Sequence, residues 1–99
     1  LRRSQARIVA TLLPRVRDIR RIGSCALDLC MVAAGLLDAY YEEGVQVWDW
    51  AAAALIAAEA GARVRVPPPE RVGEPDGMVT AAAPGIDAAL RDALRAAAG

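Results

Sequence analysis

Three short stretches of the sequence carry residue types that can bind a small charged ligand. Gly23-Ser24 precedes a helix-forming run, and backbone N–H groups at a helix start can bind an anionic or hydroxyl-rich ligand. Glu42 ends a short stretch with strand character, and ligands of open α/β sheets usually bind at such ends. Asp49 follows at the start of an alanine-rich helix. Because Mg²⁺ prefers carboxylate oxygens together with substrate phosphate and water, Asp49 could supply one ligand to such an ion.

Asp49 also has a purely structural interpretation. Residues 47–63 are rich in Ala, Leu and Glu, which favour a helix, and Gly61 suits a left-handed cap at its end. At the start of that helix, a carboxylate is favoured by the helix dipole and can accept hydrogen bonds from free N–H groups. One carboxylate alone cannot hold a divalent cation, so the spacing by itself leaves the cap and the metal ligand as alternatives.

The composition excludes several kinds of chemistry. The 99 residues contain no His, so catalysis would depend on carboxylates, hydroxyls, thiols, backbone groups or a hard metal ion. Cys25 and Cys30 are five residues apart, which suits no CxxC redox or zinc motif and indicates two buried thiols in a reduced cytoplasm. The apolar run after Asp49 breaks at Glu59, too soon for a membrane span.

The charge is unevenly distributed although the formal net charge is zero. Residues 1–21 hold seven Arg against one acid, and the remaining residues hold five Arg against eleven acids. A basic segment can attract nucleic acid or another polyanion. Because no aromatic residues interleave with these Arg, we expect a solvated helix face and no nucleic-acid partner. An interaction module that docks a partner through this segment is the alternative outside the enzyme class.

The pattern alternates helices and strands over a length that suits one domain, which predicts an α/β fold with layered helix, sheet and helix. The expected helices run from Ser4 to Pro14, from Ser24 to Gly35, across residues 47–61, and from Pro84 onward. The expected strands cover residues 16–22, 37–43, 63–66 and 78–82, with a proline-rich loop over residues 67–77.

Side-chain periodicity predicts the faces of these elements. On the strand over residues 37–43, one face carries Asp38, Tyr40 and Glu42, and the other carries Leu37, Ala39 and Tyr41. The helical sets are Ile8, Val9, Leu12 and Leu13 in the first helix, Leu27, Cys30, Met31 and Ala34 in the second, and Ile86, Ala89, Leu90, Ala93, Leu94 and Ala97 in the last. Asp87 and Arg91 are expected to pair on the outer face of the last helix.

The order of these stretches resembles the C-terminal half of the inositol monophosphatase family. The resemblance covers nearly the whole chain and is carried by Ile19-Arg20-Arg21-Ile22-Gly23-Ser24, Ala26-Leu27-Asp28-Leu29-Cys30, Val32-Ala33-Ala34-Gly35, Asp38-Ala39-Tyr40-Tyr41-Glu42 and Trp48-Asp49. Trp-Asp followed by an alanine-rich helix that ends in Glu59-Ala60-Gly61 is its most specific feature.

The resemblance implies a Mg²⁺-dependent phosphomonoesterase with a layered α/β fold, which is usually a homodimer. We expect the protein to be cytoplasmic. By position, Asp49 matches the aspartate that binds a second metal ion near the reacting phosphate. Gly23, Ser24 and Cys25 match the turn whose backbone meets the sugar alcohol, although the family commonly has Ala where Cys25 stands. Glu42 matches the acid that hydrogen-bonds a substrate hydroxyl.

The family's first metal site is missing from this sequence. That site uses a glutamate and an Asp-Pro-x-Asp-Gly-Thr/Ser loop from the N-terminal half, whereas Glu74-Pro75-Asp76-Gly77 has a different spacing and predicts only a turn. We therefore expect residues 1–99 to form the C-terminal part of a longer enzyme, with no catalytic residue of their own. Inositol 1-phosphate is the expected substrate, and the alternatives are histidinol phosphate, a nucleotide 3′-phosphate or a sugar bisphosphate.

Overall fold

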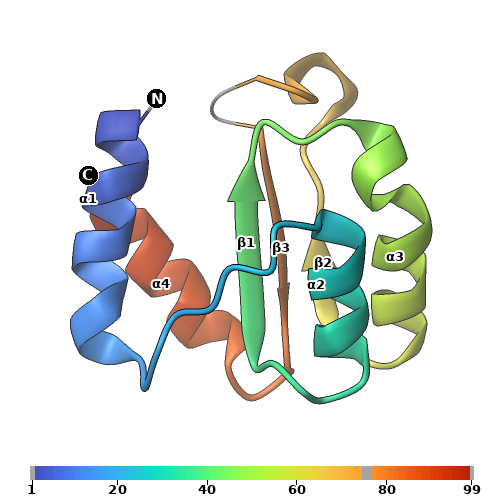
Figure 1. Cartoon of the computed structure of the whole chain (residues 1–99), viewed down its shortest axis with the longest axis horizontal. Coiled ribbons are helices and arrows are strands. Elements are labelled where there is room, and N and C mark those ends of the chain that lie inside the picture. Colours follow the sequence, from blue (N-terminus) through green and yellow to red (C-terminus); the bar gives the residue numbers. More distant parts are fainter. Residues whose placement is uncertain (1, 75–76, 99) are drawn as a thin grey trace. The chain divides into compact units, whose positions relative to one another are not determined.

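The computed structural model describes residues 2–74 and 77–98 and divides the chain into two compact parts. Residues 22–87 form one of them, which we call the sheet part. The segments on either side, up to residue 21 and from residue 88 onward, form the terminal part. The elements of both parts are labelled in Figure 1, and no helix within the described residues is long and apolar enough to cross a membrane.

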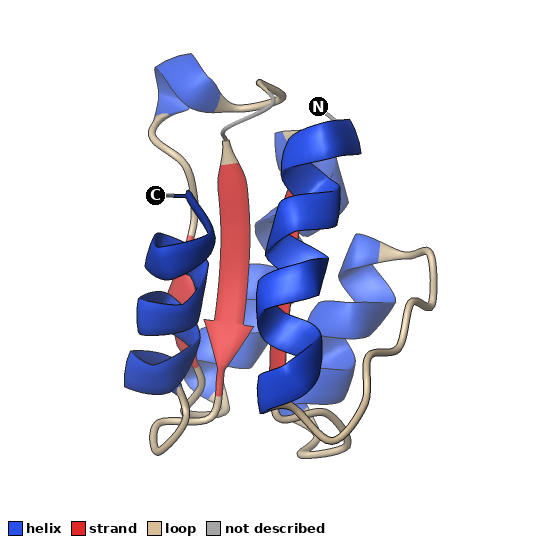
Figure 2. Cartoon of the chain, turned by 90° about the vertical axis from the view of Figure 1, so that its left-hand side faces the viewer, coloured by secondary structure: helices blue, strands red, loops and turns tan. Residues whose placement is uncertain are grey.

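The sheet part is built on three antiparallel strands in the order β1-β3-β2. They are β1 (Ala39–Glu43), β2 (Arg63–Arg65) and β3 (Met78–Ala82), shown in red in Figure 2. β3 is central, so Ala81 is opposite Tyr40 on one side and Val64 on the other. Three of the four predicted strands are confirmed, and so is the α/β fold class.

The fourth predicted strand, residues 16–22, is wrong. This segment has no helix or strand assignment, although its first residue, Val16, has the extended dihedrals φ −122° and ψ 160°. β-branched residues favour an extended backbone, but a strand also needs a neighbouring strand that takes up its backbone hydrogen bonds. Within the described residues no strand pairs with this segment.

Two helices of the sheet part begin and end where the sequence predicts. α2 (Cys25–Ala33) starts after Ser24, whose Oγ accepts a hydrogen bond of 3.2 Å from the N–H of Leu27, and this is an N-cap contact. α3 (Val47–Glu59) is followed by Gly61 with φ +98°. A left-handed residue after the last turn ends a helix at little cost only when it is Gly.

The core of the sheet part lies between these helices and one face of the sheet, where α2 and α3 also pack on each other (Figure 1). Its buried members are Cys25, Leu29, Val32, Tyr40, Ala53, Ala54, Val79 and Ala81. The buried face of α2 is therefore defined by Cys25, Leu29 and Val32, at helical spacing, together with Asp28. The predicted set that included Leu27 is wrong, because Leu27 is 56% exposed.

The terminal part contains α1 (Arg2–Leu12), a 3₁₀ turn η1 (Leu13–Arg15) and most of α4 (Asp87–Ala98). Asp87, the first residue of α4, belongs to the sheet part. The helix is expected to begin at Ser4, but α1 already begins at Arg2 and Ser4 lies inside it, so that start is wrong. Pro14 ends the α-helix as predicted, but the chain continues into η1, where Pro is tolerated at the first positions. Ile8 and Leu12 are buried, whereas the predicted Val9 and Leu13 are exposed.

The start of α4 differs from its prediction. Pro84 begins a turn, and the helix starts three residues later at Asp87, which is buried. Asp87 Oδ2 accepts a hydrogen bond of 2.9 Å from Arg65 Nη2 of β2, so the predicted pair with Arg91 is wrong. A nearly buried carboxylate requires a partner, and β2 supplies one that the helix spacing did not reveal.

The proline-rich segment between β2 and β3 is a loop with one 3₁₀ turn, η2 (Pro69–Arg71), as the sequence predicts (Figure 2). Its end returns to β1, where the N–H of Gly44 donates to the carbonyl of Gly77 at 3.2 Å. Residues 75 and 76 lie outside the described residues, and with them the predicted Pro-Asp-Gly turn.

Candidate functional site

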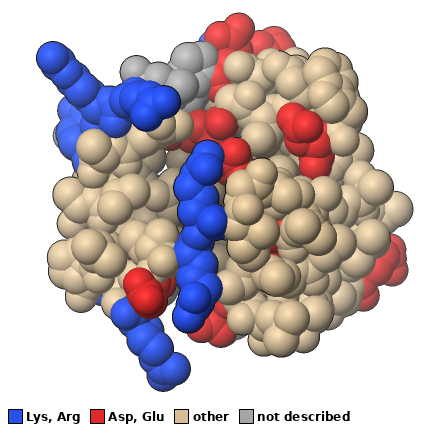
Figure 3. All heavy atoms as spheres, in the orientation of Figure 1, with Lys and Arg blue, Asp and Glu red and all other residues tan. Residues whose placement is uncertain are grey.

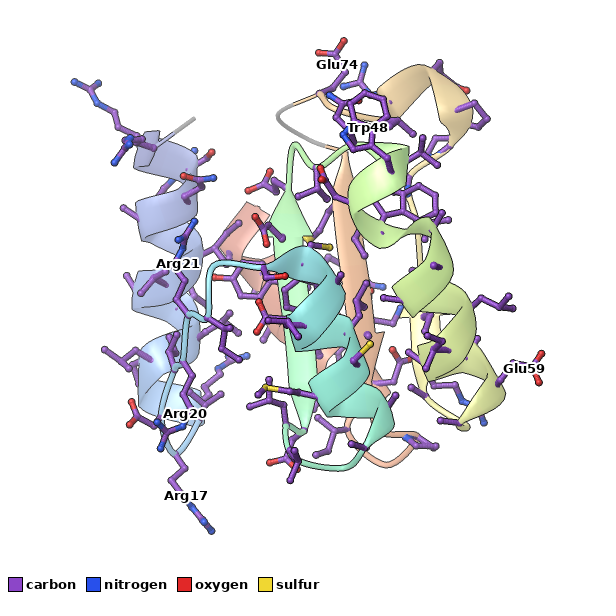
Figure 4. The ribbon with its side chains drawn as sticks, turned by 45° about the vertical axis from the view of Figure 1, so that its right-hand side comes forward. Arg17, Arg20, Arg21, Trp48, Glu59 and Glu74 are labelled. Atoms are coloured by element: carbon purple, nitrogen blue, oxygen red, sulfur yellow. The ribbon has the colours of Figure 1, made fainter. Side chains whose placement is uncertain are left out.

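One pocket of the sheet part lies where α2 and α3 begin and β1 ends. It has a volume of about 420 Å³ and is lined by Gly23, Ser24, Cys25, Ala26, Glu42, Val45, Trp48 and Asp49. All five residues that the sequence singles out are among them. Figure 4 shows Trp48 at the pocket end of α3 and Glu59 at the opposite end of that helix. Three separate segments thus bring their predicted site residues to one place.

The start of α2 presents backbone donors to the pocket. An α-helix leaves the N–H groups of its first turn without a carbonyl acceptor in the helix. The Leu27 N–H is taken by Ser24 Oγ, whereas Cys25 and Ala26, the first two helical residues, line the pocket. Gly23 precedes them with φ +88°, a left-handed conformation that an L side chain rarely adopts. This turn can therefore place amide groups against an anionic or hydroxyl-rich ligand.

The start of α3 places Asp49 in a capping arrangement. Asp49 Oδ2 accepts a hydrogen bond of 2.9 Å from the N–H of Gln46, and the N–H of Asp49 donates to the Gln46 carbonyl at 2.9 Å. Gln46 is the N-cap residue and Asp49 stands three positions later, so the prediction that Asp49 starts the helix is right only to within one turn. The side chain is exposed and lines the pocket, so capping and ligand binding are compatible.

Glu42 is held by a neighbour on the same strand. Tyr40 Oη donates a hydrogen bond of 2.6 Å to Glu42 Oε1, which confirms that these two residues share one face of β1. Tyr40 is buried in the core, and its pKa is raised well above its ordinary value, first by burial and then by hydrogen bonding with Cys25 and Glu42. The phenol therefore stays protonated and remains a hydrogen-bond donor at neutral pH.

Cys25 is a buried free thiol in the pocket wall. Burial raises the pKa of Cys25; the hydrogen bond with Tyr40 lowers it by less, and the carboxylates of Glu42, Asp49 and Asp28 raise it further. Because the thiolate is the reactive form, Cys25 is a poor nucleophile at neutral pH. Cys30, also free, is half-buried, so the prediction of two buried thiols holds fully only for Cys25.

The described residues do not build a complete metal site. Among residues 2–74 and 77–98, no group of three or more His, Cys, Asp or Glu side chains is placed to hold a metal ion. Mg²⁺ requires near-octahedral oxygen coordination and keeps several waters, so the carboxylate of Asp49 can provide one position only. The pocket lining contains two acidic side chains and no Arg, which favours a cation near the carboxylates.

Sequence reasoning missed one residue that acts on the predicted ones. Tyr40 was placed on the same strand face as Glu42, but its hydrogen bond to that carboxylate and its contact with Cys25 were not predicted. The sequence signal for this contact is the i, i+2 spacing on a strand, which puts two side chains on one face. The spacing does not determine which of the two side chains is buried. Trp48, which is 78% exposed, also lines the pocket, and its sequence signal is its place next to Asp49.

Known proteins match nearly the whole length of this chain. The profile of the inositol monophosphatase family matches residues 1–98. Inositol-1-monophosphatase SuhB of Mycobacterium tuberculosis (strain H37Rv) is 65% identical over 94 residues, which are 95% of this chain and 32% of that protein. A protein named Nus factor SuhB from Xylella fastidiosa is 52% identical over 61 residues, 62% of this chain and 22% of that protein.

Solved structures agree with the sequence comparison. Mycobacterium tuberculosis SuhB superposes with a TM-score of 0.84 at 60% identity, over 97% of this chain and 36% of that one. An inositol monophosphatase from Anabaena gives a TM-score of 0.80 at 32% identity. The chain spans about a third of the length of these relatives. The resemblance noted in the sequence is therefore confirmed: the chain belongs to the inositol monophosphatase family.

Proposed function

We propose that this chain is the C-terminal part of a Mg²⁺-dependent phosphatase that hydrolyses inositol 1-phosphate to inositol and phosphate. The observation that carries the proposal is the pocket in which the α2 turn, Glu42 and Asp49 come together from three segments. Membership of the inositol monophosphatase family supports a hydrolase in the full-length protein. Because the chain spans about a third of its relatives, the activity is assigned to the longer protein.

The charge of the pocket supports a metal requirement. A phosphate that approaches Glu42 and Asp49 meets two carboxylates and no basic side chain in the pocket lining. Bound Mg²⁺ would supply the opposing charge and activate a water molecule, so no His is needed. Asp49 keeps Oδ2 on the Gln46 N–H, and we assign Oδ1 as the single metal ligand from this chain. The other ligands would come from residues that this sequence does not contain.

The polar groups of the pocket support a polyol substrate. Glu42 offers a carboxylate oxygen that can accept a hydrogen bond from a substrate hydroxyl. The Gly23-Ser24-Cys25 turn offers backbone groups to a second hydroxyl. Inositol 1-phosphate has hydroxyls beside its phosphate and satisfies both. Histidinol phosphate, nucleotide 3′-phosphates and sugar bisphosphates are the competing substrates within the family.

A substrate panel with the full-length protein tests this proposal. In the presence of Mg²⁺, we expect phosphate release from inositol 1-phosphate with the highest kcat/KM in the panel, and loss of turnover when a chelator removes the metal. Faster hydrolysis of one of the competing substrates would replace inositol 1-phosphate. No phosphate release from any monoester would overturn the assignment as a phosphatase.

The full-length protein is also proposed to form a homodimer in the cytoplasm. Large apolar side chains are exposed on α3, including Leu55 at 62% and Ile56 at 52%, and exposed apolar surface of this kind is commonly covered by a partner subunit. Light scattering of the full-length protein is expected to give twice the mass of one chain. A monomeric mass at micromolar concentration would contradict the dimer.

A second candidate function rests on the basic N-terminal segment. Seven Arg lie within residues 1–21, and Figure 3 shows basic side chains exposed on the face that it draws. Figure 4 shows Arg17 and Arg20 extending from this segment. A complex with an acidic partner or with RNA should weaken steeply as salt rises, and salt-independent binding would exclude this role.

A further inference from the structure

We propose that Tyr40 is a positioning residue that sets the orientation of Glu42 toward the substrate hydroxyl, with Cys25 holding the phenol from its other side. The inference rests on the proposed function, in which Glu42 binds the polyol. It adds a specificity device made of three side chains from two elements: Cys25 on α2, and Tyr40 and Glu42 on β1.

The first step in the argument is the short contact between Tyr40 and Glu42. The phenol donates to Glu42 Oε1 at 2.6 Å, a distance typical of a strong hydrogen bond to a charged acceptor. A free Glu side chain samples several rotamers, and ordering it costs conformational entropy. The hydrogen bond selects one orientation before substrate arrives, and it leaves Oε2 to accept from a substrate hydroxyl.

The second step is that Tyr40 itself is fixed. It is only 9% exposed and belongs to the core cluster with Leu29 and Val79. Its backbone is paired with Ala81 of the central strand, and that of Glu42 is paired with Val79. Both residues therefore stand on a backbone held by β3, and the remaining freedom lies in the Glu42 side chain, which the phenol restrains.

The third step is the state of the phenol and its other neighbour. Burial raises the pKa of Tyr40, so the hydroxyl keeps its proton and donates throughout the neutral range. Cys25 and Tyr40 belong to the same buried core cluster, and the interaction between the thiol and the phenol also acts on the pKa of both groups. A smaller side chain at residue 25 would remove that contact and loosen the phenol.

The test uses the full-length protein and two substrates that differ in their hydroxyls. Tyr40→Phe removes the donor and keeps the ring, and Tyr41→Phe is the matched control because Tyr41 lies on the opposite face of the same strand. For inositol 1-phosphate we expect Tyr40→Phe to lower kcat/KM about tenfold, mainly through KM. For p-nitrophenyl phosphate, which has no hydroxyl for Glu42, we expect less than a twofold change. Tyr41→Phe should change neither substrate by more than twofold.

A mutant cycle with Glu42→Ala separates positioning from general damage. Once the Glu42 carboxylate is removed, Tyr40→Phe should add little further loss on inositol 1-phosphate, because the phenol then has no carboxylate to orient. Equal loss on both substrates, no loss on either, or additive losses in the cycle would each overturn the inference.

A further variant covers the case in which Tyr40→Phe does not fold. Cys25→Ala keeps the phenol and removes its other neighbour, so it should give a smaller loss that is again confined to inositol 1-phosphate. A loss shared by both substrates, or none, would count against the inference. Failure of the unmodified full-length protein to hydrolyse either substrate would instead overturn the proposed function, and the inference with it.

Discussion

At the scale of single residues, Asp49 caps α3 and still lines the pocket, so the two roles that the sequence presents as alternatives are compatible. One carboxylate oxygen accepts the Gln46 N–H and holds the first turn of α3, while the side chain stays exposed at the pocket. An Asn at this position can still accept that hydrogen bond but carries no charge for a cation. Stability and activity should therefore respond differently to the same substitution.

We predict that Asp49→Asn lowers Mg²⁺-dependent turnover of the full-length protein by about a hundredfold or more, because a metal ligand contributes several kcal/mol to the reaction. The midpoint of thermal unfolding should change little. Glu59→Gln is the control, since it removes one charge from the opposite end of the same helix (Figure 4). Phosphate-release kinetics measure both variants. Turnover of Asp49→Asn within a few-fold of the unmodified protein would exclude Asp49 as a ligand.

The buried thiol of Cys25 predicts a pH dependence of stability. Burial raises its pKa above the ordinary value of about 9, so the folded state keeps a proton that the unfolded state releases. This contribution to stability is complete below that value and is lost as pH rises through the folded-state pKa. Urea unfolding of the full-length protein between pH 8 and pH 10.5 should show a decline that is smaller in Cys25→Ala. Identical slopes in the two proteins would contradict the assignment.

At the scale of elements, the starts of α2 and α3 and the end of β1 create the pocket, and sequence signals predicted their positions well. Ser24 caps α2, and Gly61 follows the end of α3. Both could be predicted because the signals for the start and end of a helix are local and need no knowledge of the partner element. The strand predicted over residues 16–22 failed because pairing is not local. The family resemblance predicted the five pocket residues, but the role of Tyr40 depends on which side chain is buried.

The ion pair between β2 and the start of α4 gives a prediction about stability. Arg65→Met leaves the Asp87 carboxylate, whose side chain is 12% exposed, without its partner, which should cost about 1–3 kcal/mol of unfolding free energy. Arg95→Met is the control, because Arg95 and Asp92 form an exposed pair on α4 that should contribute less than about 1 kcal/mol. Denaturant unfolding measures the change in unfolding free energy for both variants. Equal changes would show that the buried pair contributes no more to stability than the exposed one.

At the scale of the whole molecule, the proposed function requires metal ligands that the residues of this pocket do not supply. Its profile match runs over residues 1–98, yet it spans about a third of its relatives, and the described residues form no cluster of three metal ligands. The missing family motifs were visible from the sequence, since an absent motif needs no structure. The pocket and its acidic lining needed the fold, because they join residues that are up to 26 positions apart.

We therefore predict that a polypeptide of these 99 residues alone releases no phosphate from inositol 1-phosphate, even when circular dichroism shows that it is folded. The full-length protein at the same concentration should be active with Mg²⁺. A colorimetric phosphate assay compares the two. Mg²⁺-dependent turnover by the short polypeptide would show that one carboxylate and the α2 turn suffice, contrary to the coordination that Mg²⁺ requires.

The common direction of α2 and α3 also has a practical use. Both helices begin at the pocket, so their last turns lie about 12 Å and 18 Å farther along their axes. The turn after α2 contains Leu36, which is 72% exposed. A fluorophore attached at this position would stand clear of bound substrate and of the groups that hold it. The end of α2 that lies away from the pocket thereby offers a place for a label, and we expect a label there to leave turnover unchanged.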